Sequence, residues 1–81
     1  MPADPSLITA HAAVLQSDAR TLAECAERLQ AIRARLEAGG CAPRWLRAAV
    51  EAHLAACATA AADLTTAATH LRRYAERAYR A

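Results

Sequence analysis

The stretch EAGGCAPRWL, residues 37–46, interrupts a chain that is otherwise suited to helices. It contains both glycines of the sequence, one of its three prolines and its only tryptophan, Trp45. Glycine just after a helix supplies the left-handed residue that ends it, and proline favours the first position of the next helix. The stretch therefore predicts a short turn between two helices, with Trp45 at the start of the second.

On either side of this turn the sequence predicts one long helix. Asp4 followed by Pro5 is a good start, because aspartate caps a helix N-terminus and proline fits the position after it. Neither Gly nor Pro interrupts the chain between Pro5 and the turn, or after the turn. We predict a helix over about 5–38, a loop over about 39–42 and a helix over about 43–80, which form one all-α domain, an antiparallel two-helix hairpin.

Apolar residues recur every seven positions in both predicted helices, as is typical of long helices packed side by side. Folded about its glycines, the chain brings together residues whose numbers sum to about 82 or 83, and leucines then oppose alanines. We expect Cys25 and Cys57 to be buried, facing and reduced, and Cys41 to be an exposed thiol in the loop. The predicted hairpin seam comprises Ile8, Leu15, Leu22, Cys25, Leu29, Ile32, Leu36, Val50, Leu54, Cys57, Leu64 and Leu71.

Composition predicts that the hairpin does not stand alone. The 81 residues are 56% hydrophobic but only 4% aromatic, and alanine supplies much of the apolar count. Two helices built largely from alanine have little interior, so we expect two hairpins to pair into a four-helix bundle. A second apolar stripe outside the seam supports this expectation. It comprises Leu7, Val14, Cys25 and Ile32 of the first helix and Trp45, Ala49, Ala56, Ala60, Ala67 and Tyr74 of the second.

Charge and hydropathy argue against several kinds of partner. The net charge is only +2 and acidic and basic residues are interspersed, whereas nucleic-acid-binding proteins usually concentrate basic residues on one face. No apolar run approaches the ~18 residues that a membrane span needs. The N-terminal sequence MPADPSLITA lacks the basic start and apolar core of a cleavable signal peptide.

The sequence offers no chemistry typical of an enzyme. The three cysteines have no CxxC spacing, and His11, His53 and His70 are spread along the chain without a Glu-x-x-His motif. No Ser-His-Asp constellation and no glycine-rich phosphate loop is present. We therefore expect no catalytic, cofactor-binding or metal-binding residues.

Arg44 and Arg47 fall in the first turn of the second helix, where the helix dipole disfavours positive charge. Two readings are open: they pair with Glu37 or Glu51, or they contact an acidic partner beside Trp45. Trp45 lies off the seam by the heptad spacing, so filling its own turn is not its whole role. We predict that it binds a partner.

An alanine-rich helical hairpin of this length, without a signal peptide and with a tryptophan at the turn, resembles the WXG-type proteins of type VII (ESX) secretion. The family's Trp-x-Gly appears here as Trp45-Leu46-Arg47, with arginine in place of glycine. The family's C-terminal export signal, Tyr-x-x-x-Asp/Glu, has two partial counterparts. Tyr74 is followed four positions later by Ala78, and the fourth position after Tyr79 lies beyond Ala81.

The resemblance implies a small secreted protein that pairs as a homodimer or with a second helical hairpin and is presented to a secretion ATPase. In that family a composite signal combines elements from the Trp side and the Tyr side, so the resemblance implies that Trp45, Tyr74 and Tyr79 are partner-binding residues. The charge argument above adds Arg44 and Arg47 to this set. A second hypothesis is a cytosolic dimerisation or adaptor module that shields a helical partner protein.

Overall fold

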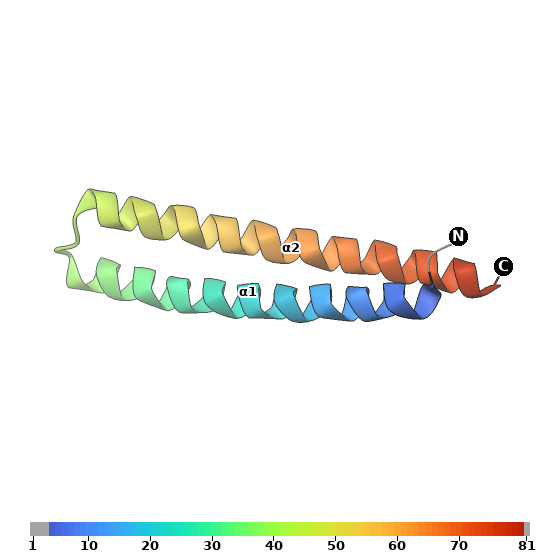
Figure 1. The fold of residues 1–81 in the computed structure, drawn as a ribbon. Helices are drawn as coiled ribbons and strands as arrows, with labels where there is room; N and C mark the ends of the chain where they lie inside the picture. The colour runs from blue at the N-terminus through green and yellow to red at the C-terminus, as the bar shows by residue number, and fades with distance from the viewer. Residues whose placement is uncertain (1–3, 81) are drawn as a thin grey trace.

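A computed structural model describes residues 4–80, which form two long helices joined by a short loop (Figure 1). Helix α1 spans Pro5–Gly39 and helix α2 spans Arg44–Arg80. The helices run antiparallel, so the start of α1 and the end of α2 lie together and the loop lies at the opposite end. The all-α helical hairpin predicted from the sequence is confirmed.

Local capping explains where the helices begin and end. The Asp4 carboxylate accepts hydrogen bonds from the Ser6 backbone N–H at 2.9 Å and from the Ser6 hydroxyl at 2.7 Å. The first of these bonds caps α1, because it gives a partner to a backbone N–H that has none within the helix. Gly40 ends α1 with a φ of 70°, and its N–H donates to the Leu36 carbonyl oxygen at 3.3 Å. Pro43 lies just before α2, and its carbonyl oxygen accepts from the backbone N–H groups of Leu46 and Arg47.

The core is a thin line along the contact between the two helices. Alanine dominates it because a side chain this small lets two helix backbones approach closely. Among residues 4–80 no large side chain is fully buried, since two helices alone cannot surround a leucine. The buried residues are Ala12, Ala19, Ala26, Val50, Leu54, Ala68 and Ala75.

Most of the predicted seam lies along this contact, but one member does not. Val50 and Leu54 are buried, and the half-buried members are Ile8, Leu15, Leu22, Cys25, Leu29, Leu36, Cys57, Leu64 and Leu71. The placement of Ile32 in the seam was wrong, because its side chain is 43% exposed. Arg33 is half-buried instead, in the same heptad row as Ala12, Ala19 and Ala26. The two seam cysteines are half-buried rather than buried, and both are free thiols.

Contacts across the hairpin give its register. Arg33 of α1 contacts Glu51 of α2, so residues at one level have numbers that sum to about 84 at this point. A shallow groove near the middle of the rod gives nearly the same sum. It is lined by Gln16, Ala19, Arg20 and Ala23 of α1 and by Ala61, Ala62, Thr65 and Thr66 of α2.

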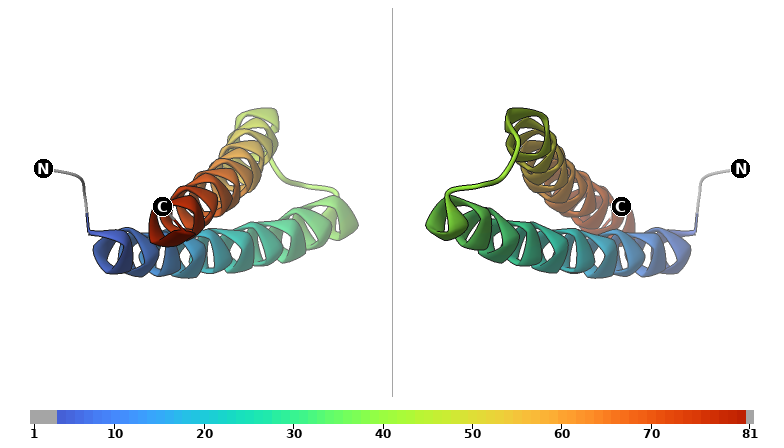
Figure 2. Two further views of the ribbon diagram at one scale, coloured as in Figure 1. Left: turned by 90° about the vertical axis from the view of Figure 1, so that its right-hand side faces the viewer. Right: turned by 90° about the vertical axis from the view of Figure 1, so that its left-hand side faces the viewer.

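The molecule is a thin rod. Its principal extents are 61 × 15 × 14 Å, and its radius of gyration of 18.1 Å far exceeds the ~12 Å of a compact protein of this length. The helices cross at an angle when viewed along the rod, and they diverge toward the loop (Figures 1 and 2). The accessible surface of 5926 Å² is about a quarter larger than the roughly 4,700 Å² typical of a compact monomer of the same mass.

Candidate protein-interaction site

The first turn of α2 presents an exposed tryptophan between two exposed arginines. Trp45 is 71% exposed, and Arg44 and Arg47 flank it in the sequence and are exposed as well. Trp45 therefore does not fill the turn. An indole with so much free surface is the kind of side chain that anchors protein contacts.

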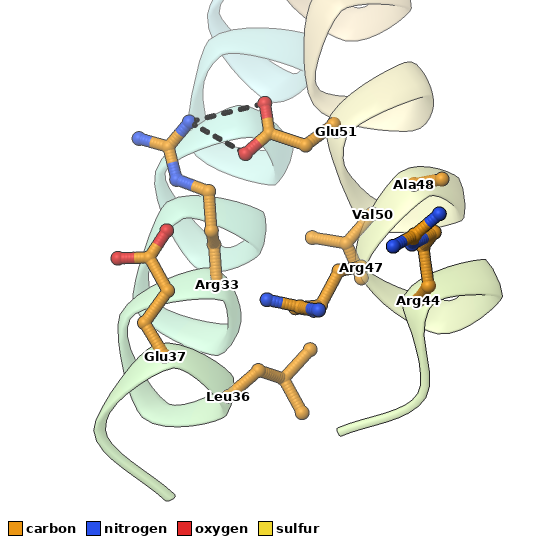
Figure 3. Close-up of a pocket in the computed structure, with 8 residues that line it drawn as sticks. All are labelled: Arg33, Leu36, Glu37, Arg44, Arg47, Ala48, Val50 and Glu51. Carbon is orange, nitrogen blue, oxygen red and sulfur yellow. Dashed lines mark hydrogen bonds and ion pairs between the residues drawn. The ribbon is translucent and has the colours of Figure 1, made fainter. Parts of the chain in front are cut away.

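A hollow of about 250 Å³ lies beside this turn, where the helices diverge (Figure 3). Leu36 of α1 and Val50 and Ala48 of α2 give it an apolar floor. Its rim is charged and comprises Arg33, Glu37, Arg44, Arg47 and Glu51. In Figure 3 the Arg47 side chain points into the space between the helices, whereas Arg44 stays on the α2 side.

The ion pair at this hollow bears on the first reading of Arg44 and Arg47, in which they pair with Glu37 or Glu51. One Arg33 nitrogen lies 3.3 and 3.4 Å from the two Glu51 carboxylate oxygens, and this is the only salt bridge within residues 4–80. Its side chains are 38% and 55% exposed, so it contributes little to stability. Glu51 is thus engaged by Arg33. Neither arginine of the first turn has a carboxylate partner among the described residues.

The predicted partner-binding residues do not form one site. Tyr74 and Tyr79 are 49% and 68% exposed and lie near the end of α2, whereas Trp45 lies at its start. The helical rise separates Trp45 from Tyr74 by roughly 40 Å. The hairpin therefore carries two separate aromatic surfaces, one beside the loop and one beside the helix termini.

Apolar side chains also lie along one long side of the rod, which we term the lateral face. Leu7, Val14 and Ile32 of α1 are 60%, 57% and 43% exposed, and Tyr74 of α2 is exposed too. Heptad spacing places them in the rows next to the seam on the same side of both helices. The α1 rows are Leu7, Val14, Thr21, Arg28 and Arg35, and His11, Asp18, Cys25 and Ile32. The α2 rows are Leu46, His53, Ala60, Ala67 and Tyr74, and Ala49, Ala56, Asp63, His70 and Arg77.

The described residues offer little for metal or redox chemistry. Within residues 4–80 no three His, Cys, Asp or Glu side chains are grouped so that they could hold a metal ion. The cysteines are free, and Cys41 in the loop is the exposed one. Neither described helix is long and apolar enough to cross a membrane.

Comparisons with known proteins give no family. The chain matches no protein-family model, and no curated protein or solved structure is significantly similar to it.

Proposed function

We propose that this chain is a pairing protein that acts by binding rather than by catalysis. It joins another helical hairpin through its lateral face to form a four-helix bundle, and it recognises a further protein at the turn around Trp45. The observation that carries the proposal is the distribution of exposed apolar side chains. Leu7, Val14, Ile32 and Tyr74 lie on one side of a hairpin whose own core is mostly alanine. Covering them removes apolar surface from water, which stabilises the paired state.

The test uses charge placed on two different sides of α1. Val14→Glu and Ile32→Glu put a carboxylate on the lateral face, whereas Ala13→Glu and Ala34→Glu put one at exposed positions outside it. We expect each lateral-face variant to raise the dissociation constant of the paired state at least about tenfold, because a buried aliphatic side chain contributes ~1.5–3 kcal/mol. The two control variants should bind like the wild type. Sedimentation equilibrium measures all five proteins.

A wild-type protein that sediments as a well-folded monomer at low micromolar concentration would contradict the pairing role. Equal weakening of pairing by the lateral-face variants and the control variants would also contradict it, because pairing would then not depend on one side of the hairpin.

Type VII export is the specific form of this role that the WXG-type resemblance supports. In that form the pair is presented to a secretion ATPase and is then carried out of the cell. The chain should then appear in the medium of a host with a type VII system and disappear when the ATPase is deleted. Retention in both hosts would contradict export and leave pairing untouched.

The second candidate is a cytosolic adaptor that shields a helical partner. Arg47 favours it, because arginine stands where the secreted family has the glycine of its turn motif. Under this role the chain stays in the cell and is recovered in complex with one protein. That protein should become insoluble when the adaptor is absent.

A further inference from the structure

The two buried rows of the seam both reach an arginine at the loop end of the hairpin. In α1 the position one heptad after Ala26 is Arg33, and in α2 the position one heptad before Leu54 is Arg47. Arg33 has a carboxylate partner across the hairpin, whereas Arg47 has none within residues 4–80. The last seam position of α2 therefore holds a guanidinium without a counter-charge among the described residues.

The surface next to Arg47 is apolar. Leu36 of α1 and Val50 and Ala48 of α2 form the floor of the hollow between the helices. Figure 3 shows the Arg47 guanidinium in the space between the two helices, and the side chains of Leu36 and Val50 turn into the same space. A ligand that fills the hollow therefore meets a charged group and an apolar surface together.

The size and charge of the hollow restrict what can occupy it. Its volume of about 250 Å³ is below the ~300–1,000 Å³ typical of small-molecule sites, so it suits one or two side chains rather than a cofactor. Its rim carries three arginines and two glutamates, which gives a formal charge of +1. The two glutamates disfavour a phosphate or any other group with several negative charges. A single carboxylate matches the charge of the rim.

Arg44 and Arg47 are placed to act on the same carboxylate. They are three positions apart on α2, so their side chains are neighbours on the helix surface. The first turn of α2 contains no acidic residue, and the helix dipole disfavours positive charge there. In Figure 3 the Glu37 carboxylate points away from α2. A carboxylate from outside relieves the repulsion between the arginines, and a guanidinium can bind both of its oxygens.

We propose that the hollow binds a segment of the partner protein in which an acidic side chain stands beside an aliphatic one. The inference rests on the proposed recognition at the turn and deepens it by naming the chemistry of the partner. The carboxylate binds Arg47, with Arg44 at the rim, and the aliphatic side chain covers Leu36 and Val50. The exposed aliphatic side chains of this chain lie on the lateral face, which the proposed pairing covers, so the occupant is another protein.

Short peptides test this chemistry on the full chain. The probe is an acetylated and amidated peptide with the sequence Ala-Leu-Glu-Leu-Ala, in which the glutamate is the only charge. Two matched peptides replace the glutamate with glutamine or both leucines with alanine. The first peptide should bind at least about fivefold more tightly than either control, because each control lacks one of the two contacts. Shifts of the Ala48 and Val50 amide signals in NMR spectra measure the three affinities.

Two variants locate the site. Arg47→Gln should weaken binding of the glutamate peptide at least about fivefold, to the level of the glutamine peptide. The control Arg73→Gln removes an exposed arginine near the far end of α2 and should bind like the wild type. Raising the salt concentration to ~0.5 M should weaken the glutamate peptide alone, because salt screens exposed charges. Circular dichroism and sedimentation equilibrium show whether both variants fold and pair like the wild type.

Preferential binding of the glutamate peptide that is lost in Arg47→Gln supports the proposal. Equal binding of the glutamate and glutamine peptides overturns the carboxylate, and tighter binding of inorganic phosphate overturns the single charge. If Arg47→Gln folds but no longer self-associates, a second copy occupies the hollow and the proposal is wrong. It is also wrong if no peptide binds.

The proposed recognition at the turn is tested separately, because Trp45 does not line the hollow. If Trp45→Ala loses the native partner, recognition at the turn stands even when every peptide fails to bind. If Trp45→Ala keeps the partner with unchanged affinity, the proposed recognition at the turn is itself overturned.

Discussion

Trp45 is the side chain whose role differs most between a structural and a recognition reading. It is the largest residue of the chain, and within residues 4–80 it is the most exposed of the large hydrophobic side chains. An exposed side chain loses little when it is truncated in the free protein, because it removes little apolar surface from water on folding. A bound partner that covers it changes that balance. We therefore expect the energetic role of Trp45 to show in binding rather than in folding.

Replacing Trp45 with Ala should change the free energy of unfolding by less than about 1 kcal/mol, measured by urea denaturation of the unbound protein. The matched variant Leu54→Ala removes a buried side chain and should cost ~2–5 kcal/mol. Binding of the partner at the turn should weaken by ~2 kcal/mol or more for Trp45→Ala. If the two variants were equally destabilised and Trp45→Ala bound the partner with unchanged affinity per folded molecule, the role of Trp45 would be structural.

Asp4 links the start of α1 to pH. The hydrogen bonds from the Ser6 hydroxyl and backbone N–H lower the pKa of its carboxyl below the ordinary value. Because the folded pKa is below the unfolded one, the ionised cap stabilises α1 above the unfolded value near pH 4 and loses this effect as the pH falls through the folded value. Asp4→Ala should therefore speed amide exchange at residues 6–8 at neutral pH. The Asp4→Asn variant still caps the helix, so its amides at residues 6–8 should exchange more slowly than those of the alanine variant. It should not show the loss of protection that the wild type undergoes when the Asp4 carboxylate is protonated.

At the scale of the helices, α1 ends because of one glycine rather than two. Gly40 adopts a φ of 70°, which a side chain with a Cβ resists, whereas Gly39 is helical and has open space around it. The two adjacent residues are both glycines, but Gly39 has a helical backbone conformation and Gly40 a left-handed one. They therefore form a natural matched pair.

Gly40→Ala should destabilise the hairpin by about 1–2 kcal/mol, because alanine must adopt the left-handed conformation. Gly39→Ala should stabilise it by about 0.5–1 kcal/mol, because alanine is the better helix former and nothing lies within 4 Å of an added Cβ. Thermal unfolding of the two variants beside the wild type checks both signs. If both variants destabilised the protein equally, the helix would not end at Gly40.

Local signals made the helices predictable, but the side-by-side arrangement was only partly so. The Asp4 cap and the glycines act within a few residues, so the sequence determines them directly. Ile32 was placed in the seam because it is apolar, yet the row of alanines controls which side of α1 faces α2, and Arg33 continues that row. A long arginine stem can cover apolar surface while its charged end reaches Glu51. That pairing joins residues 18 positions apart, and the folded numbering could have indicated it.

The candidate site shows the same limit. Heptad spacing correctly put Trp45 outside the seam and left it exposed. The separation of the turn from the tyrosines was also predictable, because the rise of one continuous helix puts Trp45 and Tyr74 roughly 40 Å apart. The hollow between the diverging helices depends on their crossing angle, which no local pattern encodes.

At the scale of the whole molecule, folding and pairing should be one process. A rod with an alanine core and 5926 Å² of exposed surface buries little on its own. The midpoint temperature of thermal unfolding should therefore rise with protein concentration, because pairing stabilises only the folded state. Circular dichroism at concentrations differing a hundredfold tests this expectation. A midpoint that stays constant would mean that the hairpin is stable as a monomer.

The position of the termini has a mechanical consequence. Pro5 and Arg80 lie near one end of the rod and the loop lies at the other (Figure 1). A force that pulls the two ends of the chain apart therefore loads the layers of the seam one after another, beginning at Ile8 and ending at Leu36. Each layer resists only with its own few contacts, so the hairpin unzips at low force and closes again from the loop. A machine that grips one end of the chain can open this protein progressively, without ever breaking all of its contacts at once.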